Sequence, residues 1–244
     1  MKTIIILLLC IKVSLGFSQE NKTVASRIKS LYEQKDCQAL IKECSILLNK
    51  EGLNLNDRID FLYYRVDCYM SLNNFSAAIS EWSKLIKLKP NQVGYYNSFA
   101  YCYWSEGMLD SALIMVSKAY QINSSDVLTL NNMAFYLSHA GKYEDAVKYA
   151  TQGLKLETLT QQEKALLLNN RGLGYIGLEK YQNALDDVNE SIKIHSNNSY
   201  QFFHRALANI GLNRLETVCE DLEESKKLGG VNMTKEYIEA YCKK

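Results

Sequence analysis

Few residues in this 244-residue chain have the types and spacing that catalysis would need. Asp60 and Asp67 could supply paired carboxylates for acid–base chemistry, but seven helical residues would hold them ~10 Å apart on a face open to water. We interpret them as an acidic lip. The three histidines, His139, His195 and His204, have no cysteine or acidic pair at the spacing of metal ligands. The sequence also lacks a phosphate-binding glycine loop, a nucleophile elbow and a His–Cys pair. We therefore expect no enzyme and no metal or cofactor site.

The cysteines are the second residue type that could do chemistry. Of the seven, Cys10 lies in an apolar N-terminal segment, and the other six are an even number that could pair in an oxidising compartment. Cys37 and Cys44 lie two turns apart on one predicted helix, ~10 Å from each other. This separation is too large for a bridge between them.

Composition limits the classes of partner. The chain is 47% hydrophobic with a single proline, which is typical of a folded, helix-rich protein. Its 28 basic residues balance 27 acidic ones, and no basic run with interleaved aromatic residues occurs in the sequence. Because no positive excess is available to neutralise a phosphate backbone, nucleic acid is not an expected partner.

The first 18 residues have the layout of a secretory signal peptide. A basic Lys2 precedes an apolar run from Ile4 to Ile11, and small residues follow. This run is much shorter than the ~20 apolar residues that cross a bilayer, so we expect no stable membrane span. We expect cleavage and export to the periplasm or the medium, with tethering by an uncleaved N-terminus as the alternative. The cleavage site stays open among Gly16, Ser18 and Gln19.

An internal sequence repeat predicts the helices on which the aspartates, histidines and cysteines lie. Within residues 127–160, Ala134 is a small residue in one predicted helix, Ala146 is one in the next, and Gly141 lies at the turn. Ala100 precedes Ala134 by 34 residues, at the same place in an earlier unit. Small residues let two helices approach closely. A repeat of this length indicates a solenoid of stacked helical hairpins.

The repeat divides the chain into units. The five regular units are residues 59–92, 93–126, 127–160, 165–198 and 199–232. Four extra residues, Gln161 to Lys164, interrupt the register. We expect a degenerate helical hairpin over 19–58, which ends in a polar connection over Lys50–Asp57, and a capping helix over 233–244.

The recurring pattern resembles the tetratricopeptide repeat. Each unit tends to have a small residue at its eighth position, an aromatic residue or Leu at the seventeenth and Ala at the twentieth. Leu85, Val218 and the occurrence of proline only at Pro90 depart from the family pattern. The resemblance implies an all-α, right-handed superhelix whose first helices line a concave groove.

The resemblance also implies which residues face that groove, because the second, fifth, ninth and twelfth positions of each unit point inward in the family. The proposed partner-binding residues are Tyr63, Asp67, Asn97, Tyr101, Trp104, Asn131, Phe135, Asn169 and Phe203. Aromatic and amide side chains of this kind suit a protein or peptide segment. The alternative is that the aromatic residues fill a tight superhelix and touch only each other.

The repeat positions also predict one disulfide. Cys219 is at the twenty-first position of the last full unit, on the side that meets the next helix, where Cys242 occupies the tenth position. We expect these two cysteines to be close enough to bridge, with two buried thiols as the alternative.

Three functions remain open at this point. The first is an adaptor or scaffold that holds a protein segment in the groove. The second is a structural subunit of an envelope or secreted complex, or a homodimer, with no groove ligand. The third is a binder of carbohydrate or another small ligand at Tyr101, Trp104 and Phe135. The sequence does not fix the oligomeric state.

Overall fold

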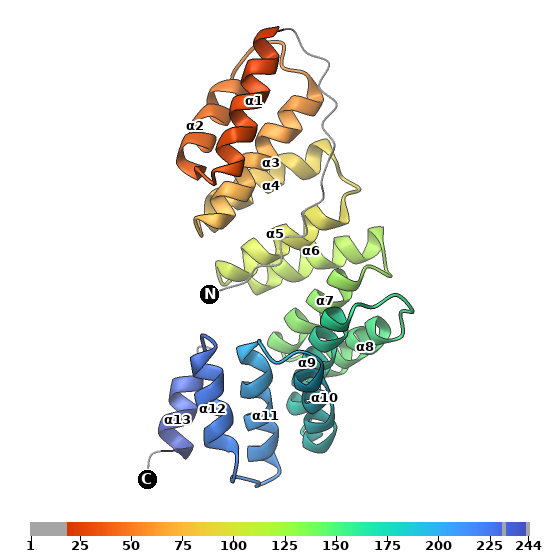
Figure 1. Ribbon diagram of the computed structural model, residues 1–244. Coiled ribbons are helices and arrows are strands. Elements are labelled where there is room, and N and C mark those ends of the chain that lie inside the picture. The colour runs from red at the N-terminus through yellow and green to blue at the C-terminus, as the bar shows by residue number, and fades with distance from the viewer. Residues whose placement is uncertain (1–18, 231–232, 243–244) are drawn as a thin grey trace. The chain divides into compact units, whose positions relative to one another are not determined.

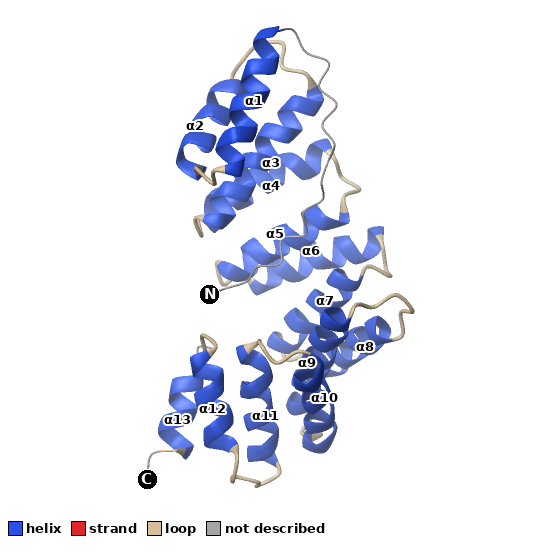
Figure 2. Ribbon diagram, viewed as in Figure 1, coloured by secondary structure: helices blue, strands red, loops and turns tan. Residues whose placement is uncertain are grey.

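The computed structural model describes residues 19–230 and 233–242. Within these ranges the chain forms thirteen α-helices and no strand (Figures 1 and 2). The all-α prediction is confirmed. The predicted signal peptide over residues 1–18 lies outside the described residues.

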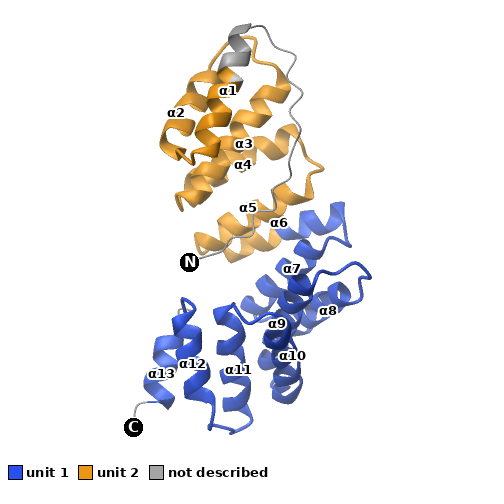
Figure 3. Ribbon diagram, viewed as in Figure 1, with its two compact units in different colours: residues 1–3, 116–244 blue, residues 4–115 orange. Residues whose placement is uncertain are grey.

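The helices belong to two compact units, which divide inside α6 between Met115 and Val116 (Figure 3). In the N-terminal unit the helices are α1 (Gln19–Glu33), α2 (Cys37–Leu48), α3 (Leu55–Ser71), α4 (Phe75–Leu88), α5 (Val93–Ser105) and the start of α6 (Leu109–Ile122). In the C-terminal unit they are the rest of α6, α7 (Val127–His139), α8 (Tyr143–Leu154), α9 (Gln161–Gly177), α10 (Tyr181–Ile194), α11 (Ser199–Gly211), α12 (Val218–Lys227) and α13 (Thr234–Tyr241).

Each regular hairpin turns at a residue in the left-handed region, at the fifteenth position of its unit. These residues are Asn73, Gly107, Gly141, Glu179 and Asn213, with φ between 56° and 76°. The next residue then donates its N–H to a carbonyl five residues back, as Lys142 does to Leu137 at 2.9 Å. This pattern satisfies carbonyls that the end of the first helix would leave unpaired, so it ends that helix and begins the turn.

Two segments outside the repeat register are helical in the structure, the first wholly and the second in part. Residues Gln161 to Lys164, expected to interrupt the register, form the first turn of α9. Thr160 caps this helix by accepting from the Glu163 N–H, and the Glu163 carboxylate accepts from the Thr160 N–H at 2.8 Å. The polar segment 50–57 is likewise shorter than expected, because Asn54 caps α3 and the helix begins at Leu55. In both places the capping side chain adds a turn to the first helix of the unit.

Small residues bring the helices into contact in both units. Seven alanines that the repeat places in the helix interfaces are fully buried: Ala78, Ala100, Ala112, Ala134, Ala146, Ala184 and Ala206. Gly172 occupies the eighth position of its unit, and a Cβ there would lie 2.7 Å from Val188 Cγ2. The close approach of α9 to α10 therefore depends on that missing side chain.

Three of the five regular hairpins carry an arginine–acid ion pair between their two helices, as does the degenerate first hairpin with Arg27 and Glu43, and the sequence analysis missed these pairs. In the regular hairpins the pairs join an arginine at the seventh position to an acid at the twenty-third: Arg65 with Glu81, Arg171 with Asp187, and Arg205 with Asp221. In the second of these, Arg171 Nε and Nη2 each donate to one carboxylate oxygen of Asp187 at 2.7 Å. The other two units have Phe99 and Met115, or Met133 and Tyr149, at these positions. The same two positions thus hold either an ion pair or an uncharged pair.

Candidate protein-binding face

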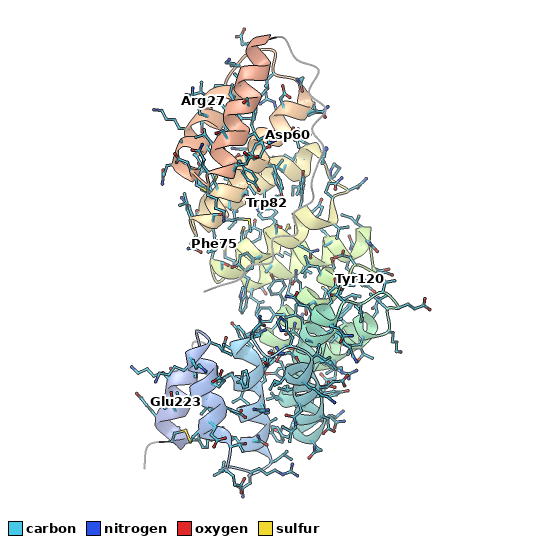
Figure 4. The ribbon with its side chains drawn as sticks, in the orientation of Figure 1. Arg27, Asp60, Phe75, Trp82, Tyr120 and Glu223 are labelled. Carbon is cyan, nitrogen blue, oxygen red and sulfur yellow. A yellow bond between two sulfur atoms is a disulfide. The ribbon has the colours of Figure 1, made fainter. Side chains whose placement is uncertain are left out.

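The predicted groove residues lie in both compact units, and each unit is described separately. In the N-terminal unit, Asp60, Tyr63 and Asp67 are spaced along one side of α3 and are each partly exposed. The Tyr63 ring stacks on Tyr95 of α5 with centroids 6.2 Å apart, and its edge meets Trp82 of α4 at the same distance. Figure 4 labels Asp60 and Trp82 among these side chains. Tyr63 is therefore held by ring contacts from two other helices.

The two aspartates are poorly hydrated. Burial raises the pKa of Asp60 and of Asp67, and for Asp67 a hydrogen bond from the Tyr32 hydroxyl on α1 opposes this rise. Burial and the Asp67 charge together raise the pKa of Tyr32, so its hydroxyl stays protonated and donates. Neither aspartate makes an ion pair with another residue of the described chain. This face therefore carries negative charge that a cationic group could neutralise.

The α5 residues of the prediction differ in their exposure. Tyr101 is partly exposed, and its ring meets Phe75 of α4 edge-on, with centroids 5.7 Å apart. Trp104, one turn further along α5, is also partly exposed. Asn97 is only 2% exposed. A side chain this buried cannot contact a partner, so Asn97 does not belong to the binding face.

In the C-terminal unit the inner residues mostly contact each other. Asn131 Oδ1 on α7 accepts from Asn170 Nδ2 on α9 at 2.8 Å. Phe135 of α7 meets Tyr200 of α11 edge-on at 6.3 Å between centroids and His139 at 4.5 Å. Phe135 thus contacts a helix of the second unit along the repeat. This is the arrangement expected if aromatic side chains fill a tight superhelix.

Two more predicted groove residues of this unit are buried. Asn169 is 3% exposed, and its Oδ1 lies 3.0 Å from His204 Nδ1. Burial lowers the pKa of His204 to about 3, so the ring is neutral and donates to the amide oxygen. Phe203 is 6% exposed and packs in a core cluster with Val218, Leu222 and Ile238. The expectation that Asn169 and Phe203 face a groove is corrected, because α11 contacts Asn169 through His204, and α12 and α13 pack against Phe203.

The structure joins the two cysteines at the C-terminal end. Cys219 of α12 and Cys242 form a disulfide with Cα atoms 5.5 Å apart. Cys37, Cys44, Cys68 and Cys102 are free. Among the helices of the described residues, none combines the length and apolar character that a bilayer span requires.

The chain is similar to known proteins that are built from helical repeats. No protein-family model matches the sequence. A stretch of 88 residues is 27% identical to the small glutamine-rich tetratricopeptide repeat-containing protein 2 of Mycosarcoma maydis; it covers 36% of this chain and 25% of that protein. A tetratricopeptide repeat protein structure from Parabacteroides merdae superposes with a TM-score of 0.63 at 12% identity, over 93% of this chain and 100% of that one. The chain has the tetratricopeptide repeat fold.

Two further solved structures share the fold. PilW, described as a widely conserved type IV pilus biogenesis factor, matches with a TM-score of 0.62 at 14% identity, over 71% of this chain and 78% of its own. MamA from Desulfovibrio magneticus matches with a TM-score of 0.59 at 11% identity, over 72% and 97% of the two chains. The chain spans a quarter of the length of the curated relative that it matches.

Some residues of the N-terminal face were not found from the sequence. Tyr32 lies in the degenerate first hairpin, where the repeat register gives no inward position. Tyr95 lies at the third position of its unit, outside the inward set, yet it stacks on Tyr63. Tyr63 and Tyr95 are 32 residues apart and not 34, so the repeat period does not pair them.

Proposed function

We propose that the chain is an exported, non-catalytic adaptor that binds a segment of another protein. The fold of its neighbours supports an interaction scaffold in general. The binding face that we propose consists of Asp60, Tyr63, Asp67, Tyr101 and Trp104 of the N-terminal unit, and we call it the acidic aromatic face. The parts of Asn131 and Phe135 that their contacts with Asn170 and Tyr200 leave exposed make a secondary surface in the C-terminal unit.

The observation that carries this proposal is the combination of partly exposed rings and partly buried carboxylates that make no ion pair within the described chain. Tyr63 is fixed by Tyr95 and Trp82, so little side-chain entropy is lost when a partner covers it. Burial removes water from both carboxylates and raises their pKa, so a cation from a partner would stabilise their charged forms. The preferred segment therefore has apolar side chains next to Lys or Arg.

Site-specific photocrosslinking in the native compartment tests this function. A photoreactive phenylalanine analogue replaces Tyr101, and in a control it replaces the exposed Lys87 of α4. We expect a discrete adduct with another protein only from position 101. Adducts of equal yield from both positions, or from Lys87 alone, would contradict binding on the acidic aromatic face.

A charge variant separates this face from a nonspecific apolar surface. Asp67→Asn keeps the shape of the side chain and its acceptor for Tyr32, and removes the negative charge. We expect the yield of the position-101 adduct to fall several-fold, while the helical content is unchanged. An adduct of twice the chain mass would instead indicate a second copy of this chain.

Export rests on the layout of residues 1–18. We expect the mature protein, isolated from its native source, to lack Met1 to at least Gly16. An intact mass that includes these residues would contradict cleavage.

A further inference from the structure

We infer that α13 is a second docking site, which receives an amphipathic, basic helix from a partner protein. This inference does not depend on the acidic aromatic face. It rests on the comparison of α13 with the other first helices of the repeat.

The eighth position of each unit shows the difference most clearly. Val66, Ala100, Ala134 and Ala206 occupy this position in four regular units and are at most 1% exposed. Ala206, for instance, packs in one cluster with Val218 and Leu222 of the following helix α12. Ala240 is the equivalent residue 34 positions later, and it is exposed. A helix covers this position in the hairpins, and none covers it on α13 within the described residues.

The neighbouring side chains complete an apolar surface around Ala240. Tyr241 is 43% exposed, and its ring stacks on Tyr237 with centroids 6.0 Å apart and planes 12° from parallel. Glu236, Tyr237, Ala240 and Tyr241 line a shallow, open depression. The small residue between two tyrosines leaves room for a large side chain, as Ala206 does for those of α12.

The opposite side of α13 is fixed to the rest of the C-terminal unit. Ile238 is buried in the cluster with Val218 and Leu222, and Thr234 Oγ1 lies 3.4 Å from Ser225 Oγ of α12. The Cys219–Cys242 disulfide fastens the far end of the helix, and it lies near the C-terminal end in Figure 4. An eight-residue helix is too short to be stable alone in water, so these contacts preform the surface.

The chemistry of the occupant follows from α12 and from Glu236. Because α12 covers Ala206 with Val218 and Leu222, the partner helix should carry large aliphatic residues four positions apart. Glu236 is exposed and places a negative charge at the depression, so a Lys or Arg beside these residues is favoured. We therefore commit to a basic amphipathic helix.

A second copy of the chain fits less well. Two α13 helices around a two-fold axis would bring two Glu236 carboxylates to the same contact, which is unfavourable. Tyr241 is 43% exposed and Tyr237 is partly buried, so the two rings and their neighbours offer less than ~400 Å² of surface, under half of the ~800 Å² per partner in a stable interface. The area fits a weak docking contact better than a dimer.

Fluorescence anisotropy with a labelled peptide tests the docking site on the full mature chain. The probe is a 14-residue helical peptide of Leu and Lys with Leu at amphipathic spacing, and its control has Glu in place of Lys. We expect saturable binding of the Lys peptide and at least tenfold weaker binding of the Glu peptide. Ala240→Arg should weaken binding of the Lys peptide at least tenfold, since the new side chain fills the depression. Lys235→Ala, on α13 but outside the depression, is the matched control and should bind as the wild type does.

Two further variants keep the test decisive. Glu236→Gln should weaken binding of the Lys peptide and reduce its salt dependence. Cys219→Ser with Cys242→Ser should weaken binding because α13 is no longer fixed, without changing crosslinking at Tyr101. The inference is overturned if Ala240→Arg binds the Lys peptide as the wild type does while its circular dichroism is native. It is also overturned if light scattering shows a dimer of the wild type that Ala240→Arg dissociates.

Discussion

The Arg171–Asp187 pair offers a test of how the repeat tolerates charge inside a hairpin. The Arg171 side chain is 22% exposed and Asp187 is 10% exposed, and two hydrogen bonds join them. Asp187→Ala would leave a guanidinium that cannot lose its proton in a site with little water. Breaking a fully buried pair costs ~3–5 kcal/mol, and an exposed pair is worth ~0–1 kcal/mol. Because water reaches part of Arg171, we expect Asp187→Ala to lower the free energy of unfolding by ~2–3 kcal/mol.

The chain itself suggests the compensating change. The unit 127–160 has Met133 and Tyr149 at the same two positions. The double variant Arg171→Met with Asp187→Tyr copies that pair and leaves no unpaired charge. It loses the contact of the Arg171 guanidinium with the Tyr175 ring at 5.9 Å, a cation–π interaction worth ~0.5–1 kcal/mol. We therefore expect the double variant to be within ~1 kcal/mol of the wild type, more stable than Asp187→Ala.

Urea unfolding followed by circular dichroism measures both variants. Glu190→Ala is the matched control, because Lys164 and Glu190 join the same two helices, α9 and α10, with side chains 41% and 48% exposed. It should cost less than ~1 kcal/mol. If Asp187→Ala costs no more than Glu190→Ala, the pair is not a buried interaction. If the double variant is less stable than Asp187→Ala, an uncharged pair cannot replace the ion pair at these two positions.

Three more expectations concern local features. Thr160→Ala removes the side-chain cap of α9 and should cost ~1 kcal/mol, whereas Glu163→Gln, which keeps an acceptor, should cost less; thermal unfolding distinguishes them. Reducing the Cys219–Cys242 disulfide opens a loop between residues 23 positions apart and should lower the free energy of unfolding by roughly 3 kcal/mol in the loop-entropy description. Peptide mapping of the unreduced protein that finds both thiols free would contradict the disulfide. The pKa of His204 in the folded protein is lowered to about 3. Between pH ~6.5 and pH ~3 only the unfolded state therefore binds a proton at this residue. The free energy of unfolding should fall by up to ~1.4 kcal/mol for each pH unit across that range. His204→Gln should remove that part of the slope, and an unchanged slope would show that His204 is not its source.

The sequence predicted the helical hairpins well because their signals are local. Glycine or asparagine at four of the five turns favours the left-handed conformation, and small residues at 34-residue spacing mark the helix contacts. Capping side chains at Asn54 and Thr160 begin α3 and α9 one turn before the repeat register does, so these helix starts depend on the caps and not on the 34-residue spacing.

The binding residues were predicted less well, because a repeat position fixes direction but not exposure. Asn97, Asn131 and Asn169 share the fifth position of three units, yet Asn131 is partly exposed and the other two are buried. For Asn169 the difference comes from the next first helix, whose His204 reaches the amide. Such a contact joins residues 35 positions apart, and no local pattern contains it.

The sequence by itself determined the fold class, the 34-residue spacing of the small residues, and the positions of Cys219 and Cys242 relative to the repeat. These depend on spacing along a regular helix. Only the tertiary structure decided which inward residues remain exposed, that Arg171 and Asp187 pair across a hairpin, and that Ala240 is uncovered where Ala206 is not. Exposure is decided by neighbouring helices that come from other parts of the chain, and the same residue at the same repeat position is buried or exposed according to whether such a helix is present.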